Sequence, residues 1–350
     1  MGRLNAAISW DTLEAQKWSI LTTSLAGNTH RSYNVGIKQY MVFCAQMGLS
    51  PLPLTPDVVE NFCVALSHRV GVKSIKVYLC GIQHWSLMFG FDNKLSAMLR
   101  LPYVLRGIRR RQGSTHTRPP RLPITLAHLR CILHYLRVSL PPYDCTMLTA
   151  AVLTAFFGLL RVSEYTSPTT SRFDSTVHLT LDDVHINWIR RLVYLRIKAS
   201  KTDPFRLGVT IRLGATNNFL CPVHAMLRYI MIRGVRWGPL FMFGDNNFLT
   251  RAHITTLLRH SLPRTPNVNT HSFRRGGASA LAAVGTPTYV IQIMGRWRSD
   301  AYIRYVTFSD EFILNANRIM AHPDSSRDSG LSNSSGFQLP SGHSSSEFRI

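Results

Sequence analysis

A proline-rich basic segment divides this sequence of 350 residues into two parts with different patterns. Residues 113–123 read GSTHTRPPRLP, hold three prolines and show no apolar period, which is typical of a linker. Before the linker, apolar residues recur at helical spacing; after it, helical and strand-like patterns are mixed. The sequence therefore predicts two domains, 1–112 and 124–320. A tail rich in Ser, Gly and Pro, 321–350, is expected to be disordered.

The first domain is predicted to be a small helical bundle. Behind a predicted N-cap at Thr29, apolar residues follow at steps of four, three and four, namely Tyr33, Ile37, Tyr40 and Cys44. A second helix is expected to start at Thr55-Pro56, because proline suits the first turn of a helix. Two more are expected to start near Ser74 and Pro102.

The second domain is predicted to be mainly helical with a small antiparallel sheet, an α+β class. Its first helices are expected over residues 126–138 and 143–160, and later ones from about Pro222, Thr250, Phe273 and Thr286. Four short strands are expected between them, over Val177–Leu181, Val184–Trp188, Leu192–Lys198 and Leu207–Leu213. Residues 199–206, with Asp203-Pro204, are expected to form the turn between the last two.

The charge balance points to a polyanionic partner. Forty Lys and Arg residues stand against 18 Asp and Glu, a formal net charge of +22. Nucleic acid is the leading interpretation and an anionic membrane surface the second. No apolar run approaches the roughly 20 residues of a spanning helix. Four arginines at the end of the first domain are expected to face DNA: Arg106, Arg109, Arg110 and Arg111.

Metal chemistry has little support in the sequence. The six cysteines are scattered without a C-x-x-C pair, which argues against structural zinc and indicates a reducing compartment. A nuclease that uses two Mg²⁺ ions needs several carboxylates, but the second domain is poor in them, and its acidic pair Asp182-Asp183 suits a turn. DNA cleavage by this chain would therefore have to use Arg, Lys and His side chains to stabilise the reacting phosphate.

Four clusters of such residues follow one another along the second domain. Arg161 and Glu164 close an apolar helix, where they could equally form a helix-end ion pair. Lys201 lies in the predicted turn, a place where most lysines are merely solvated. His271 and Arg274 are three residues apart before Gly276-Gly277, a pattern that favours function. The last cluster reads GRWRSDAYIRY, from Gly295 to Tyr305. Its tyrosines suit packing, base stacking or nucleophilic attack.

In this order, LLRVSE, SKT, HSFRRGG and GRWRSDAYIRY resemble the motifs of the tyrosine recombinase, or phage integrase, family. They are most similar to recombinases of eukaryotic DIRS-like and Crypton-like mobile elements. The resemblance covers residues 124–320 and implies a catalytic domain of that type. Residues 1–112 match the family's helical core-binding (SAM-like) domain in character but not in motifs.

The resemblance implies a role for each cluster residue. Tyr305 would attack the scissile phosphate and form a 3′-phosphotyrosyl link, while Arg161 and Arg274 hold its non-bridging oxygens. Lys201 would protonate the departing 5′ oxygen, His271 would assist proton transfer at the tyrosine, and Glu164 would support the cluster. The resemblance implies neither a cofactor nor a metal.

Two departures from the family pattern leave alternatives open. Many relatives place His or Trp nine residues before the tyrosine, where this chain has Arg296; Trp297, one residue later, is expected to fill that role by packing and an indole hydrogen bond. Tyr302 competes with Tyr305 as nucleophile, and Lys198 competes with Lys201 as acid.

The resemblance also implies partners and a setting. These are double-stranded DNA and a homo-multimer on it, a dimer or tetramer, with no membrane. A helix expected over Asp310–Ala321 would dock on a neighbouring protomer or on its own domain. The compartment is the nucleus if the element is eukaryotic and the cytoplasm otherwise. Two other interpretations remain: a catalytically idle DNA-binding protein descended from such an element, and a type IB topoisomerase.

Overall fold

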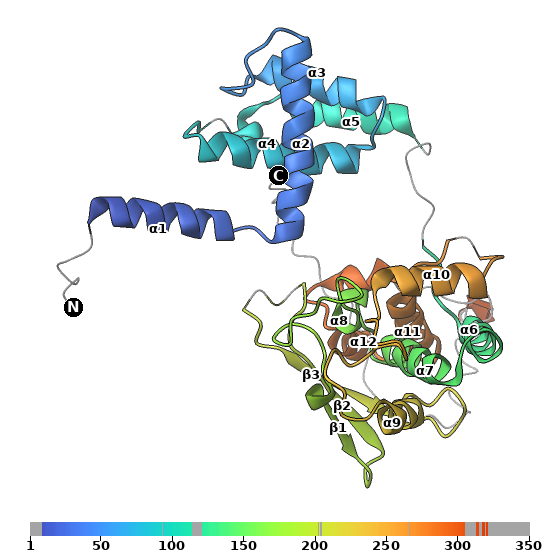
Figure 1. Cartoon of the computed structure of the whole chain (residues 1–350). Helices are drawn as coiled ribbons and strands as arrows, with labels where there is room; N and C mark the ends of the chain where they lie inside the picture. Colours follow the sequence, from blue (N-terminus) through green and yellow to red (C-terminus); the bar gives the residue numbers. More distant parts are fainter. Residues whose placement is uncertain are drawn as a thin grey trace. The chain divides into compact units, whose positions relative to one another are not determined.

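The chain is described by a computed structural model that covers residues 9–92, 94–113, 121–201, 203, 205–265 and 267–304. Of residues 305–350 it describes Ile313, Leu314, Asn317, Arg318 and Met320. These residues form two compact units, one with the residues up to 113 and one that begins at residue 121 (Figure 1). The predicted tail, 321–350, lies outside the described residues, as does most of the helix expected over Asp310–Ala321.

The first unit is helical, as the apolar spacing predicts. Its helices are α1 (Trp10–Thr23), α2 (Gly27–Gln46), α3 (Pro56–Ser67), α4 (Val72–Met88) and α5 (Leu101–Gln112), with a short 3₁₀ helix, η1 (Leu95–Ala97), before α5. Thr55 is the N-cap of α3 as predicted. The predicted N-cap at Thr29 is wrong, because Ala26 is the N-cap of α2 and Thr29 lies inside this helix, and α4 begins two residues before the expected Ser74. α2 and α4 pack closely at Gly36, which has no side chain. A Cβ atom at this position would lie only 2.6 Å from Tyr78 of α4.

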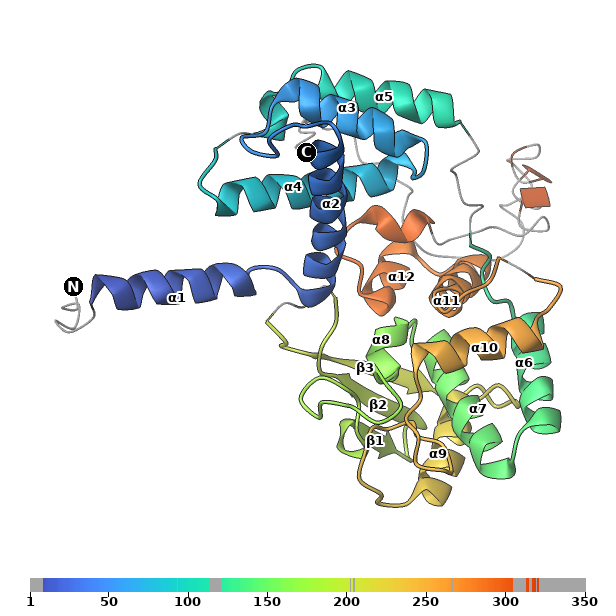
Figure 2. The same ribbon diagram turned by 45° about the horizontal axis from the view of Figure 1, so that its top comes forward.

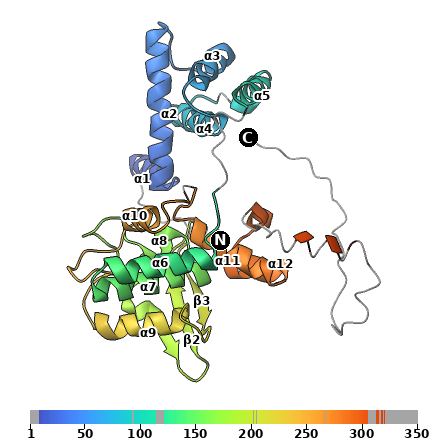
Figure 3. The ribbon, with the colours of Figure 1, turned by 90° about the vertical axis from the view of Figure 1, so that its right-hand side faces the viewer.

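The second unit is built around α7. Its helices are α6 (Leu126–Ser139), α7 (Pro142–Phe157), α8 (Val162–Tyr165), α9 (Pro222–Arg233), α10 (Arg251–Ser261), α11 (Ser272–Ala283) and α12 (Thr288–Gly295). Residues 150–156 of α7 are all buried, since α6 and α9 flank this helix and α11 also packs on it (Figure 3). α12 lies against α11 (Figure 2). The 3₁₀ helices η2 (Leu181–Asp183) and η3 (Asp300–Arg304) complete this part.

A three-stranded antiparallel sheet packs on this helical layer. Its strands β1 (Val184–Asn187), β2 (Leu192–Ile197) and β3 (Val209–Gly214) follow in the order β1-β2-β3. Alternate residues of β2 and β3, namely Val193, Leu195, Ile197, Ile211 and Leu213, are buried in the core of the unit. The predicted class, mainly helical α+β with a small antiparallel sheet, is confirmed.

Two further local predictions are wrong. No strand covers Val177–Leu181: the Asp174 carboxylate accepts hydrogen bonds from the Thr176 backbone N–H and hydroxyl and holds a turn there. The second is the end of α7, which stops at Phe157 and not at residue 160. The Leu160 N–H donates to the Ala155 carbonyl and Leu159 adopts a φ of 48°, the geometry of a Schellman helix end.

Candidate active site

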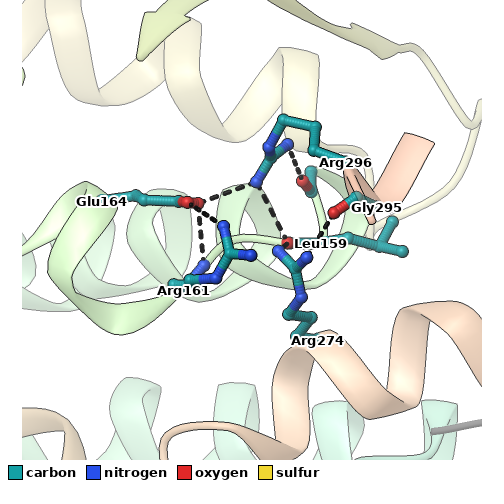
Figure 4. Close-up of polar contacts among 7 residues, drawn as sticks. Leu159, Arg161, Glu164, Arg274, Gly295 and Arg296 are labelled. Atoms are coloured by element: carbon teal, nitrogen blue, oxygen red, sulfur yellow. Dashed lines mark hydrogen bonds and ion pairs between the residues drawn. The ribbon is translucent and has the colours of Figure 1, made fainter. Parts of the chain in front are cut away.

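Arg161 and Glu164 form an ion pair at the start of α8. The Glu164 carboxylate accepts hydrogen bonds from Arg161 Nη1 and from the Arg161 backbone N–H, each at 2.9 Å (Figure 4). Because Glu164 is only 3% exposed, these donors replace the water that its carboxylate loses on burial. The side chain of Arg161 is 18% exposed, so it is only partly covered by the protein.

The end of α7 presents carbonyl groups to two further arginines. A helix leaves its last carbonyls without partners inside the helix, and they carry its negative end. The Leu159 carbonyl accepts from Arg274 Nη1 at 2.6 Å and from Arg296 Nη2 at 3.3 Å, and the Gly158 carbonyl accepts from Arg296 Nη1 at 3.2 Å (Figure 4). The left-handed turn at Leu159 directs these carbonyls toward the cluster.

His271 and Arg274 lie at the first turn of α11. Arg274 is fully buried, and besides the Leu159 carbonyl its guanidinium donates to the Gly295 carbonyl. The predicted close packing at the glycine pair is confirmed: a Cβ on Gly276 would lie 2.0 Å from the Ile124 carbonyl oxygen, and one on Gly277 would lie 2.5 Å from the Phe156 carbonyl oxygen. Without Cβ atoms there, α11 can bring Arg274 up to the end of α7.

The pKa of His271 is strongly lowered, to about 4. Burial is the main cause, and the positive charges of Arg274, Arg161, Arg275 and Arg251 add to it. His271 is therefore neutral at pH 7 in the folded chain.

The turn after α12 covers Arg274. The guanidinium carbon of Arg274 lies 4.4 Å from the centre of the Trp297 ring, a cation–π contact. Arg296 is the left-handed C-cap of α12 and pairs with Glu164 at 2.8 Å. Tyr302, 7% exposed, packs beside Trp297 with Leu159 and Ile291. Tyr305 lies outside the described residues.

The two candidate lysines differ in their surroundings. Lys198, at the end of β2, pairs with Asp183 at 2.6 Å and is partly buried. Lys201 is exposed in the connection between β2 and β3, which spans the predicted turn. The Asp203 carboxylate accepts from the backbone N–H groups of Leu207 and Gly208 and shapes this connection. Lys201 thus has the more accessible ammonium group of the two.

The residues predicted from the sequence fall into three groups. Arg161, Glu164, Arg274, Arg296 and Trp297 meet in one cluster, and His271 lies close enough to Arg161 and Arg274 for their charges to act on its pKa. Lys201 lies on the hairpin, in the same unit. The α5 arginines are all exposed on the first unit, namely Arg106, Arg109, Arg110 and Arg111.

Arg251 was missed by the sequence reasoning. It is the first residue of α10, is exposed, and contributes to the lowered pKa of His271. The start of α10 lies near α8 because the Ser167 N–H donates to the Leu249 carbonyl at 2.8 Å. The N-cap signal of Thr250 marked the helix start, but nothing in the sequence tied its next residue to His271.

In the described part of the chain, no three His, Cys, Asp or Glu side chains are grouped as metal ligands would be. Within the same residues, none of the helices has the length and apolar character needed to span a membrane.

Solved recombinase structures share the fold of this chain. No protein-family model and no curated protein matches its sequence. The XerH site-specific recombinase bound to palindromic difH substrate is 13% identical over 91% of this chain and 86% of its own, with a TM-score of 0.57. The Tn1549 transposon integrase in complex with transposon right end DNA is 13% identical over 87% and 98%, with a TM-score of 0.56. A lambda integrase dimer bound to a COC′ core site is 12% identical over 84% and 76%, with a TM-score of 0.54. The fold therefore matches that of tyrosine recombinase catalytic domains.

Proposed function

We propose that this protein cleaves and rejoins DNA through a covalent 3′-phosphotyrosyl intermediate, in site-specific or integrative recombination of a mobile element. The observation that carries the proposal is the meeting of Arg161, His271 and Arg274, which come from two separate stretches of the chain, within a recombinase fold. A reacting phosphate carries extra negative charge, and cations fixed in advance stabilise it without reorganisation.

The phosphate is bound by the two arginines. Arg161 is anchored by Glu164 and partly exposed, so its guanidinium can hold a non-bridging oxygen. Arg274 is covered by Trp297 and fully buried. We therefore expect the Trp297 ring to turn aside on DNA binding, while the backbone of the turn and Arg296 stay in place, and so open Arg274 to the second oxygen. Trp297 would then line the phosphate site, where its indole N–H can donate.

Tyr305 is the proposed nucleophile. Its phenolic oxygen forms a bond to phosphorus as the bond from phosphorus to the 5′ oxygen breaks. With the phosphate bound, its negative charge offsets that of the arginines and raises the pKa of His271 again, so that His271 can take the phenolic proton while Lys201 protonates the 5′ oxygen. Burial of Tyr302 supports this choice, because that ring packs in a small core. Lys198 forms an ion pair with Asp183, which supports the choice of Lys201 as the general acid. Rejoining reverses these steps and conserves the phosphodiester energy.

Double-stranded DNA is the proposed partner, with a dimer or tetramer of the chain on it. The net charge of +22 and the exposed arginines of α5 support DNA binding. The motifs favour an origin in a DIRS-like or Crypton-like element, and with it a nuclear setting.

The proposal is tested with a labelled duplex that carries a nick beside the cleavage site, so that cleavage is trapped. The wild type is expected to give a protease-sensitive protein–DNA adduct in the presence of EDTA, Tyr302→Phe to retain it, and Tyr305→Phe to lose it. Loss in Tyr302→Phe alone would move the nucleophile to Tyr302. No adduct from the wild type on any bound duplex would favour an idle DNA-binding protein. Relaxation of supercoils without exchange between two sites would favour a topoisomerase.

A further inference from the structure

The turn Gly295–Trp297 contacts both phosphate-binding arginines, one of them through Glu164. Arg274 donates to the Gly295 carbonyl and lies under the Trp297 ring, and Arg296 pairs with the carboxylate that holds Arg161. We propose that this turn is the positioning element of the site, and that Arg296 fixes Arg161 through Glu164 without contacting the scissile phosphate. This inference rests on the proposed function.

Arg296 is committed to partners inside the protein. Its Nη2 lies 2.8 Å from Glu164 Oε2 and 3.3 Å from the Leu159 carbonyl oxygen, and its Nη1 lies 3.2 Å from the Gly158 carbonyl oxygen (Figure 4). The side chain is 12% exposed. If Arg296 turned to a phosphate, the buried carboxylate of Glu164 would keep only one of its two cations, which costs more than leaving a neutral carbonyl group without a donor.

Glu164 transmits this constraint to Arg161. One carboxylate oxygen accepts from Arg161 Nη1, and the other accepts from both Arg296 Nη2 and the Arg161 backbone N–H. Donors on both oxygens prevent the carboxylate from rotating, so the Arg161 side chain keeps one direction. Two cations around one buried anion also leave a net positive charge for the phosphate.

The turn is specified by its own sequence. Position 295 has to be a glycine, because a Cβ atom there would lie 1.6 Å from a ring carbon of Trp297. Arg296 adopts a left-handed φ of 57°. This backbone turn points the side chains of Arg296 and Trp297 in different directions. This explains the departure from the family pattern. The residue at the position of Arg296 supports the site from inside, and the next residue, Trp297, lies against Arg274.

The salt dependence of DNA binding separates a positioning role from a phosphate contact. The full chain with Tyr305→Phe binds a duplex without cleaving it, and the slope of log K against log salt reports the phosphates that are neutralised. Adding Arg296→Gln is expected to leave the slope unchanged. Arg161→Gln, the matched control, should lower it by about one unit. In the chain that retains Tyr305, Arg296→Gln is expected to slow adduct formation on the nicked duplex about 100-fold, since small misplacements of a catalytic group are costly. Arg296→Lys should restore part of the rate.

Thermal melting tests the link to Glu164 without any activity. The losses in Tm from Arg296→Gln and Glu164→Gln are expected to be smaller together than their sum, because both remove one shared contact. A slope lowered by one unit in Arg296→Gln, a wild-type adduct rate, or fully additive losses in Tm would each overturn the inference. An inactive wild type that still shows the unchanged slope and the coupling would remove only the proposed chemistry.

Discussion

Acid should destabilise this protein through His271. The pKa of this imidazole is about 4 in the folded chain against 6.5 for an ordinary histidine. Between these values the unfolded chain binds the additional proton, so the free energy of unfolding falls as the pH falls from about 6.5 to about 4. At 1.36 kcal/mol for each pH unit the loss is about 3 kcal/mol. A domain as large as the second unit loses roughly 2–4 °C in Tm for each kcal/mol of unfolding free energy. The titration of His271 alone should therefore lower the Tm by roughly 6–12 °C.

Parallel melts isolate this contribution. Other groups titrate in the same range, so the wild type is compared with His271→Gln, which is neutral at every pH. The wild-type Tm should fall further than that of the variant between pH 7.5 and pH 4. Replacing the exposed His134 of α6 in the same way is the control and should behave as the wild type. A constant difference in Tm between the wild type and His271→Gln across this range would refute the reasoning. It would mean that the arginines and burial do not keep His271 neutral.

Three further outcomes are expected. Gly276→Ala should destabilise the second unit by about 3 kcal/mol or unfold it, because the new Cβ would meet the Ile124 carbonyl oxygen. Its control, Gly107→Ala, lies in open space on α5 and should stabilise the first unit by about 0.5–1 kcal/mol. Chemical denaturation measures both changes. Glu164→Gln should cost about 3 kcal/mol on melting, since it leaves buried guanidinium groups without their anion. Arg110→Gln should weaken DNA binding about equally for all sequences and lower the salt slope by about one unit; an unchanged slope would place Arg110 away from the phosphates.

Local patterns predicted most elements, because each depends on residues close in sequence. The start of α3 at Thr55-Pro56 and the strands on either side of the Asp203 turn follow from capping, proline geometry and alternation. The strand expected over Val177–Leu181 failed because the Asp174 side chain competes for the backbone there. The length of α7 was overestimated because a left-handed leucine ends it, and glycine is the usual signal for that geometry.

The sequence by itself determined the kind of chemistry. It supplied cations in place of clustered carboxylates, a tyrosine behind them, and glycines where α11 must approach α7. Only the tertiary structure decided which groups act on one another. Glu164 lies between Arg161 and Arg296, Trp297 covers Arg274, and burial together with four nearby arginines keeps His271 neutral. Some of these relations join residues more than 100 positions apart, such as Glu164 and Arg296. They follow from how α7, α8, α11 and α12 pack, which no local pattern encodes.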